Sequence, residues 1–332
     1  MNRFVRSAIV PFVAVWAVGC GAPDGAREVE PEPAARILGH GVISTGEAAD
    51  ELQPSISADG RTLFFARRVP DGRFTLFAAR RGSTDDPDDW TDWDEPEMLP
   101  FSGDYDDQEP FISADGRRLY FTSNRPAPGS EQANRGREPW VVERTRGNGS
   151  GWGEPRPVDP DLTLEPPDTP DLSRFWGQPR GPVEGPDGSL YFWAERPDTR
   201  GHTDLYRVEP DTAGGGYGEP VNLGPPVSSE RYETSAAFAP DGSWIIFGRD
   251  EDEDGYGLGD LYGARRIGDG WTGAWGEPRN LGPLVNSPAF DASPAVTSNG
   301  RFLLFSSNRS IEGEGTGRHN IYVIELERLE LE

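Results

Sequence analysis

The chain has 332 residues and a formal net charge of −25, with 42 glycines, 32 prolines and 11% aromatic residues. Every basic residue is an arginine, and so acidic a chain repels phosphate backbones, so we expect no nucleic-acid partner. One cysteine and three histidines exclude a disulfide framework and make a histidine or cysteine metal cluster a poor hypothesis.

Residues 1–20 are predicted to be a secretory leader. Arg3 and Arg6 precede an apolar run too short to span a bilayer comfortably. The run ends in Ala-Val-Gly-Cys20, which resembles a bacterial lipobox, whose cysteine is lipidated and becomes the mature N-terminus. We therefore expect a lipid anchor at Cys20 as the sole membrane attachment. An ordinary cleaved leader is the alternative. Because Gly21 follows rather than aspartate, the resemblance implies the cell envelope, at the outer membrane of a Gram-negative bacterium.

Residues 21–34 carry proline, glycine and acidic residues with little that could be buried. We interpret them as a flexible tether, which would reach roughly 40 Å if extended. The remaining residues, 35–332, are predicted to form one domain built from repeats.

The repeat is a short hairpin, seen most clearly from Pro110 to Pro126. An Ala-Asp-Gly turn at residues 114–116 joins two strands, and Asp and Gly tolerate the positive φ that such turns require. An apolar and aromatic run, Leu-Tyr-Phe at 119–121, is typical of a buried strand. Five copies are marked by the turn residues, with spacings of 56, 72, 54 and 58 residues: Asp59, Asp115, Asp187, Asp241 and Asn299.

Each repeat continues with a third strand, such as that around Asp204-Leu-Tyr206, and with a fourth that follows an aromatic residue and Glu-Pro, as at Trp275 to Pro278. Four strands per repeat is the unit of a β-propeller blade. The sequence therefore predicts an all-β fold, a β-propeller of five four-stranded blades.

The two ends of the domain indicate how the ring closes. The fifth repeat stops after its third strand, while Arg36-Ile-Leu-Gly39 resembles the fourth-strand segments Asn222-Leu-Gly and Asn280-Leu-Gly. We predict that this N-terminal strand completes the last blade, which removes exposed sheet edges. Six blades are the alternative, with the extra blade inside the long interval between residues 116 and 186.

These repeats resemble the TolB-like, WD-repeat-like β-propeller family of bacterial envelope proteins, across residues 35–332. The resemblance rests on the recurring P-x-x-S-x-D-G-x-x-L-x-F and S-N-R…D-x-Y patterns. It implies a non-catalytic binding or scaffolding module for an envelope protein, a peptide or a glycan. We expect a monomer that touches the membrane through its lipid anchor alone.

The loops that join blades and the loops between second and third strands share one face of a propeller, and here they are the long ones. Function tends to lie on long loops held by a rigid scaffold. We therefore expect the binding face to contain residues 100–109, 126–137, 163–181, 225–235, 249–260 and 283–293.

An acidic residue stands eight positions before the turn residue in four of the five repeats: Glu51, Asp107, Glu233 and Asp291. The third repeat has Pro179 instead. These positions open the innermost strands, so we expect them around the mouth of the central channel. They either accept backbone hydrogen bonds and lock the ring or form a site for a cation or ligand.

Two other stretches are candidate sites. Asp250, Asp252 and Asp254 alternate before a glycine, as in the first half of a calcium loop, although the twelfth position is Leu261; a solvated hairpin tip is the alternative. Arg174, Phe175 and Trp176 lie in the one large insertion, where they would either anchor a ligand or plug the core of the propeller. Calcium is thus the one cofactor considered.

Catalysis is the competing interpretation. Five-bladed propellers host glycosidases that use paired Asp and Glu, and the chain has many acidic residues. No histidine occurs in a context typical of a nucleophilic triad. Binding or scaffolding is therefore preferred over a hydrolytic enzyme of the glycoside hydrolase type.

Overall fold

The computed structural model describes residues 35–46, 48–82, 86, 88–126, 136–145, 151–164, 175–211, 216–250, 253, 255–268, 274–311 and 316–329. These residues belong to one compact unit that begins at Ala34. The leader and tether predicted for residues 1–34, including Cys20, lie outside the described residues. The described elements are strands, apart from two short 3₁₀ turns at Pro160–Leu162 and Leu326–Arg328.

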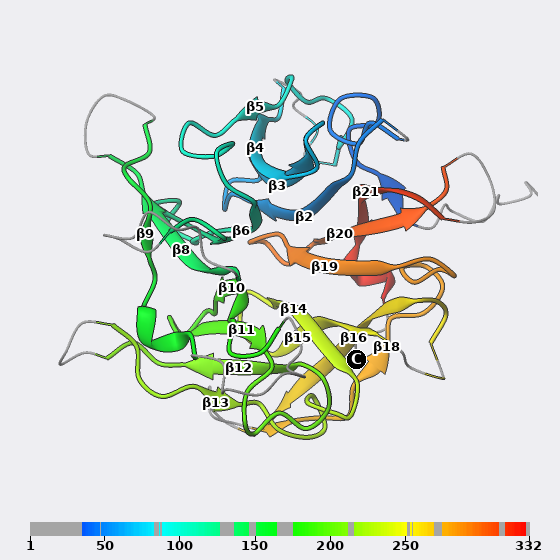
Figure 1. Ribbon diagram of the computed structural model, residues 1–332. Helices are drawn as coiled ribbons and strands as arrows, with labels where there is room; N and C mark the ends of the chain where they lie inside the picture. The colour runs from blue at the N-terminus through cyan, green and yellow to red at the C-terminus, as the bar shows by residue number, and fades with distance from the viewer. Residues whose placement is uncertain are drawn as a thin grey trace, which may run out of the picture. The chain divides into compact units, whose positions relative to one another are not determined.

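Five antiparallel sheets form the five predicted blades, and they are arranged in a ring (Figure 1). In the first four blades, the sheet order follows the chain. The strands of blade 1 are β2 (Glu51–Ile56), β3 (Thr62–Arg68), β4 (Phe74–Arg80) and β5 (Glu97–Met98). Those of blade 2 are β6 (Asp107–Ile112), β7 (Arg118–Ser123), β8 (Glu138–Glu143) and β9 (Arg156–Pro157). Those of blade 3 are β10 (Arg180–Glu184), β11 (Leu190–Ala194), β12 (Asp204–Val208) and β13 (Val221–Asn222).

Blade 4 consists of β14 (Tyr232–Phe238), β15 (Trp244–Asp250), β16 (Gly259–Ile267) and a fourth strand in two pieces, β17 (Ala274–Trp275) and β18 (Arg279–Asn280). Proline has no N–H to donate to a ladder, so Pro278 between the two pieces accounts for the break. Blades 1 to 3 show the same interruption as a single bridge at the aromatic residue, for example between Arg81 and Trp93.

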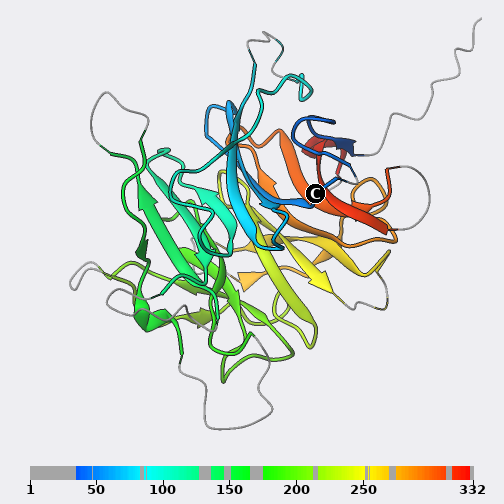
Figure 2. The same ribbon diagram turned by 45° about the horizontal axis from the view of Figure 1, so that its top comes forward.

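Blade 5 confirms the predicted closure. It consists of β19 (Asp291–Val296), β20 (Phe302–Arg309), β21 (Thr316–Glu325) and the N-terminal β1 (Arg36–Ile37), which pairs with β21 through Arg36 and Val323. Figure 2 shows β1, in dark blue, beside the red β21. The innermost strands β2, β6, β10, β14 and β19 contact one another around the ring, and β19 contacts β2. The alternative of six blades is therefore wrong.

The first two strands of each blade are joined by the turn that marked the repeats. Asp115 accepts bonds from the Ser113 hydroxyl at 2.6 Å and from the Arg117 N–H at 3.0 Å. Gly116 follows with φ of +69°, a conformation that glycine adopts without steric cost. The other four turns repeat this arrangement with small differences.

Five apolar clusters make the core, one between each pair of neighbouring blades. Successive side chains of a strand point to opposite faces of the sheet. Accordingly, Phe64 of β3 packs with blade 2, while Phe65 packs with blade 5. Both faces of every blade are covered, which is why the second strands are continuous apolar runs rather than alternating ones.

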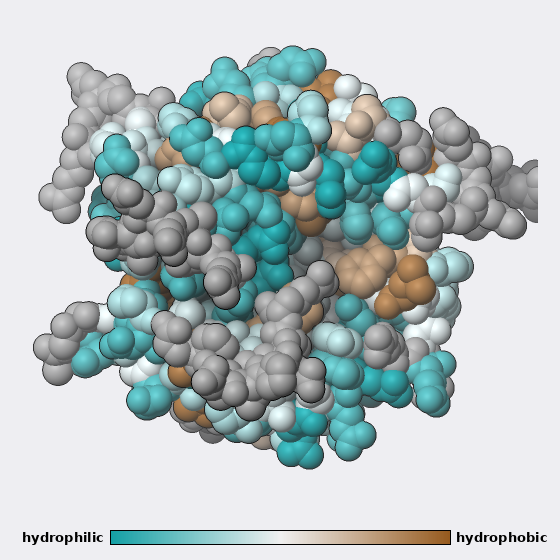
Figure 3. Space-filling view, in the orientation of Figure 1, coloured by the Kyte–Doolittle hydropathy of each residue, from teal (hydrophilic) through white to brown (hydrophobic). Residues whose placement is uncertain are grey.

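The surface is hydrophilic over much of the view in Figure 3. Teal side chains border the hollow near the centre, and a smaller brown, apolar patch lies beside it. Among the described residues, the structure contains no helix of the length and apolarity needed to cross a membrane.

Candidate functional site

The five innermost strands each carry a β-bulge where they approach the axis. The ladder to the second strand shifts register there, and the bulged residue has a positive φ between +37° and +59°. We call these five residues the bulge ring: Gln53, Glu109, Gly181, Ser235 and Ser293. Four of them are not glycine, so they hold a backbone conformation that is unfavourable for L-residues, and such strain often accompanies functional sites.

The residue after each bulge explains another part of the repeat. It is proline in blades 1, 2, 3 and 5 (Pro54, Pro110, Pro182 and Pro294) and alanine in blade 4 (Ala236). The axis-facing edge of an innermost strand has no neighbouring strand to accept its N–H groups. Proline, which has none, fits such an edge without loss.

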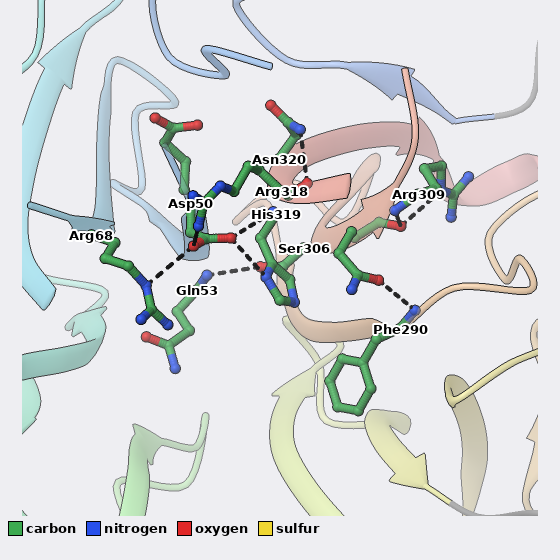
Figure 4. Close-up of polar contacts among 12 residues, drawn as sticks. Asp50, Gln53, Arg68, Phe290, Ser306, Arg309, Arg318, His319 and Asn320 are labelled. Carbon is green, nitrogen blue, oxygen red and sulfur yellow. Dashed lines mark hydrogen bonds and ion pairs between the residues drawn. The ribbon is translucent and has the colours of Figure 1, made fainter. Parts of the chain in front are cut away.

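Hydrogen bonds link part of the bulge ring from blade to blade. The N–H of Gln53 donates to the Ser306 hydroxyl of blade 5 at 2.8 Å (Figure 4). The N–H of Glu109 donates to the Gln53 side-chain oxygen at 2.8 Å, and the N–H of Gly181 donates to Glu109 Oε2 at 2.9 Å. Trp193 Nε1 donates to Glu109 Oε1 at 3.2 Å. Both oxygens of this buried carboxylate are therefore engaged by blade 3.

A cavity of about 640 Å³ lies on the loop side of the bulge ring, and we call it the loop-face chamber. Residues from each of the six segments expected on the binding face line it: Asp106, Gln108, Gly136, Arg137, Phe175, Gln178, Arg180, Thr234, Ser235, Asp250, Phe290, Ala292 and Ser293. Gln53, Glu109, Trp193 and His319 also contribute to the wall. The chamber thus combines amide, hydroxyl and charged groups with three aromatic side chains.

The charged groups of the chamber are paired. Asp106 binds the Arg137 guanidinium and accepts bonds from the Phe74 N–H and Gln108 Nε2, both at 3.1 Å. Burial opposes ionisation of Asp106, but the bonds from Arg137 and Gln108 outweigh it and hold its pKa below the usual value. Glu109 lies 3.7 Å from the Arg180 guanidinium. The carboxylates of Asp106 and Glu109 are therefore committed to protein donors.

His319 enters the chamber from blade 5 and is held by Asp50 of blade 1 (Figure 4). Asp50 Oδ1 accepts the His319 N–H at 3.0 Å and lies 3.3 Å from Nδ1, while Arg318 and Arg68 bind Oδ2 at 3.0 and 3.1 Å. Burial lowers the pKa of His319, although Asp50 opposes this. A carboxylate only accepts hydrogen bonds, so Nδ1 carries the proton and Nε2 remains an acceptor. Beside the imidazole stands Phe290, edge-on at 6.3 Å.

The four acidic residues of the repeats do not act as a group at the channel mouth. Each is fully buried and bound to an arginine at or just beyond the end of the second strand of its own blade. The pairs are Glu51–Arg67, Asp107–Arg125, Glu233–Arg249 and Asp291–Arg309, at 2.6 to 3.1 Å. None of the four carboxylates lines the loop-face chamber. The structure therefore pairs each carboxylate within its own blade and does not gather the four at this cavity.

Each pair also fastens the chain that enters the blade, and we call this arrangement the arginine clamp. In blade 4, the Ser229 N–H donates to Glu233 at 2.8 Å, and Arg249 binds the carbonyls of Pro226 and Val227 at 3.3 and 3.1 Å. Blade 3 lacks the acid but retains Arg196, which binds the Leu162 carbonyl at 2.8 Å. The acids were found by aligning the repeats, whereas their arginine partners were missed.

The insertion places one of its three candidate residues in the chamber. Phe175 lines the wall and packs edge-on against Trp193 at 5.3 Å. Trp176 instead forms a backbone bridge with Glu195. Arg174 lies outside the described residues.

The structure describes one of the three aspartates of the calcium hypothesis. Asp250 ends β15 and lines the loop-face chamber, but Asp252 and Asp254 lie outside the described residues. No group of three or more histidine, cysteine, aspartate or glutamate side chains suited to a metal ion occurs in the described part of the chain.

No protein-family model matches the sequence, and no curated protein matches it. Solved structures show the fold. An exo-1,5-α-L-arabinanase from a bovine ruminal metagenomic library is 11% identical, with a TM-score of 0.51, over 83% of this chain and 92% of that one. An endo-arabinase from Bacteroides thetaiotaomicron is 13% identical, with a TM-score of 0.50, over 85% and 96%. A protein assigned as TolB from Agrobacterium tumefaciens is 16% identical, with a TM-score of 0.42, over 83% and 90%. At identities this low, the likeness to the two arabinanases shows a shared fold and nothing further.

Proposed function

We propose that this chain is a non-catalytic binding module of the cell envelope, whose loop-face chamber takes the end of a glycan. The observation that carries the proposal is the composition of the chamber wall. Hydrogen-bond donors and acceptors such as Gln108, Gln178 and Thr234 occur there together with the aromatic side chains of Phe175, Trp193 and Phe290. Ligand sites commonly combine apolar surface with a few placed polar groups, and a sugar ring offers both an apolar face and hydroxyls.

The size of the chamber supports the same ligand class. At about 640 Å³ it falls within the range of small-molecule sites, and it accommodates a short saccharide rather than a folded partner. The chain's net charge of −25 favours a neutral glycan over a polyanionic one.

Hydrolysis is the second candidate, since Asp106, Glu109 and Asp250 all line the chamber. A glycosidase needs one carboxylic acid that is protonated and one carboxylate that is free to act. The lowered pKa of Asp106 keeps it ionised, and both oxygens of Glu109 are occupied by Trp193 and the Gly181 N–H. These contacts favour binding over catalysis.

The cellular location is part of the proposal. The basic start, the short apolar run and the lone cysteine support a lipid anchor at Cys20, followed by a tether at residues 21–34. Such an anchor would hold the propeller at the membrane surface, where envelope glycans are within reach of its loops.

A glycan array followed by calorimetry with the best neutral glycan tests the proposal. Phe290→Ala is expected to weaken binding about twofold to twelvefold, since aromatic contacts contribute about 0.5–1.5 kcal/mol. Ile267→Ala removes an exposed apolar side chain that lies outside the chamber and the six loop segments, and it should bind like the original protein. Equal affinities in all three proteins, or binding to peptides alone, would refute the assignment. Release of a shorter saccharide during incubation would favour the hydrolase.

A further inference from the structure

A second cavity, of about 490 Å³, lies on the hairpin side of the bulge ring, and we call it the hairpin-face chamber. Four members of the bulge ring, Gln53, Glu109, Ser235 and Ser293, line both chambers. Beyond them the walls differ. Residues before the bulge line the loop-face chamber, whereas residues after it line the hairpin-face chamber.

The wall of the hairpin-face chamber is mainly apolar. Every blade contributes proline, alanine or larger aliphatic and aromatic side chains: Pro54, Ile56, Pro110, Phe111, Ile112, Pro182, Val183, Ala236, Ala237, Phe238, Pro294, Ala295 and Val296. Water in such a cavity finds few hydrogen-bond partners, so apolar ligands bind there preferentially.

The mouth of this chamber is open because the residue before the Asp or Asn of each hairpin turn has no long side chain. These rim residues are Ala58, Ala114, Pro186, Pro240 and Ser298, and all five are exposed. The same five-fold repeat that supplies the turns therefore also keeps an entrance clear of bulky side chains.

One polar group in the wall is incompletely bonded. Glu184 follows Val183 on β10, and its Oε1 binds Arg118 at 2.7 Å. Its other oxygen, Oε2, is buried and has no hydrogen-bond partner among the residues that the structure describes. A buried acceptor without a donor is costly, and a ligand that supplies the donor removes that cost. The other two acids of the wall, Asp115 and Glu109, already hold donors.

The volume sets the size of the ligand. A cavity of about 150 Å³ lined by apolar side chains binds benzene. The hairpin-face chamber, at about 490 Å³, is about three times as large, which corresponds to a body of about three fused rings or an acyl chain of similar volume.

We propose that the hairpin-face chamber is a second ligand site, which binds a small apolar molecule bearing an amine or hydroxyl group that donates to the Glu184 carboxylate. The apolar body replaces water along the proline and alanine wall. The donor group supplies a second hydrogen bond to the Glu184 carboxylate, of which Arg118 binds one oxygen. This site is separate from the glycan site in position and in ligand chemistry, so it does not depend on glycan binding.

Anthracene derivatives provide matched probes. 1-Aminoanthracene, 1-hydroxyanthracene and anthracene-1-carboxylate share one three-ring body and differ in the head group. We would titrate each into the full chain held in lipid nanodiscs and follow the fluorescence. Because the probes also partition into lipid, the measured quantity is the difference between nanodiscs that carry the original protein and nanodiscs that carry a variant.

Rim variants test the location of the site. Ala58→Trp and Ala114→Trp place a large side chain at the mouth, at exposed positions where folding should be unaffected. Each should weaken binding of 1-aminoanthracene at least tenfold. Ala274→Trp makes the same change at an exposed position on β17, outside the chamber, and should bind like the original protein. Unchanged binding in the rim variants, or no binding to the original protein, overturns the proposal.

The head groups test the role of Glu184. The amine and hydroxyl probes should bind at least tenfold tighter than the carboxylate, which brings no donor and meets a second negative charge. In Glu184→Gln this preference should fall severalfold, because a neutral amide accepts a weaker bond and repels no anion. Glu143→Gln changes another glutamate paired with an arginine, at 2.9 Å and largely exposed, and should leave the preference intact. Equal affinity for all three probes in the original protein overturns the assignment.

Discussion

Replacing Arg249 by methionine should destabilise the domain more than the same replacement of Arg196. The two arginines occupy equivalent places in blades 4 and 3 and are buried to a similar extent. Both contact carbonyls of the incoming chain, at Val227 and Leu162 respectively. The main difference is that Arg249 also binds Glu233 at 2.9 Å, whereas blade 3 has no acid at that position.

The magnitudes follow from that difference. Arg196→Met removes a charged hydrogen bond to a carbonyl, which typically costs about 1.5–3 kcal/mol. Arg249→Met removes comparable bonds and also leaves the fully buried Glu233 without a counter-charge, a change that typically costs about 3–5 kcal/mol. Methionine retains much of the packing of the arginine stem in both cases. The expected excess loss at Arg249 is therefore about 2 kcal/mol.

The additional loss of stability in Arg249→Met, relative to Arg196→Met, should depend on pH. Burial already raises the pKa of Glu233 above its ordinary value of 4.5, despite bonds from Ser229 and attraction by Arg249. Without Arg249 the pKa rises further. A carboxyl whose pKa is higher in the folded state binds its proton more tightly there, so folding is favoured at low pH and weakened as pH rises through the folded pKa. The Arg249→Met variant should therefore lose more stability at pH 8 than at pH 5.

Urea unfolding of both variants at pH 5 and pH 8 measures these quantities. The double variant Arg249→Met with Glu233→Gln provides the control, because it removes the buried charge together with its partner. It should recover part of the loss seen in Arg249→Met at pH 8. Equal losses for Arg196→Met and Arg249→Met at both pH values would show that the buried ion pair does not have the role inferred from its geometry.

Three further predictions follow from the ends and the seam of the ring. Cys20→Ser should release the protein from membranes, and intact-mass analysis of the original protein should show acyl chains on a chain that starts at Cys20; a start elsewhere would refute the anchor. Deletion of residues 35–44 should lower the melting temperature by removing β1, whereas deletion of 21–34 should not; equal tolerance would contradict the closure. Asp50→Asn should lower the melting temperature, because it weakens the contacts that join blades 1 and 5, and it should lower the pKa of His319 further in an NMR titration. An unchanged melting temperature and an unchanged imidazole pKa would contradict both roles of Asp50.

The fold was predictable because its determinants are local and repeated. A turn such as Ala114-Asp115-Gly116 has one compatible backbone, and Asp115 forms its bonds within four residues. The second strands, covered on both faces, reveal themselves as apolar runs. The closure of the ring was predictable for the same reason. The N-terminal Arg36-Ile37 has the sequence pattern of a fourth strand, yet no third strand precedes it in the chain.

The arrangement of the site was less predictable because it depends on contacts between distant residues. The alignment of repeats located Glu233 but could not show that its side chain turns into the blade toward Arg249 rather than toward the axis. The sequence around the bulge at Gln53 has only one feature that could have predicted it, which is the proline that follows. The bond between Asp50 and His319 joins residues 269 positions apart, which no local pattern records.

The bulge ring gives the propeller axis its two-sided character. A regular strand sends alternate side chains to opposite faces, and one extra residue shifts that alternation for everything after it. Each innermost strand therefore changes register where it passes the axis. Before the bulge, Gln108 and Thr234 present polar groups to the loop-face chamber, and after it, residues such as Phe111 and Val296 present apolar groups to the hairpin-face chamber. A substitution at one bulge residue, such as Glu109→Gly, would alter the wall of both chambers at once. Substitutions on either side of the ring would alter one chamber and leave the other unchanged, so the two proposed ligand sites can be perturbed independently.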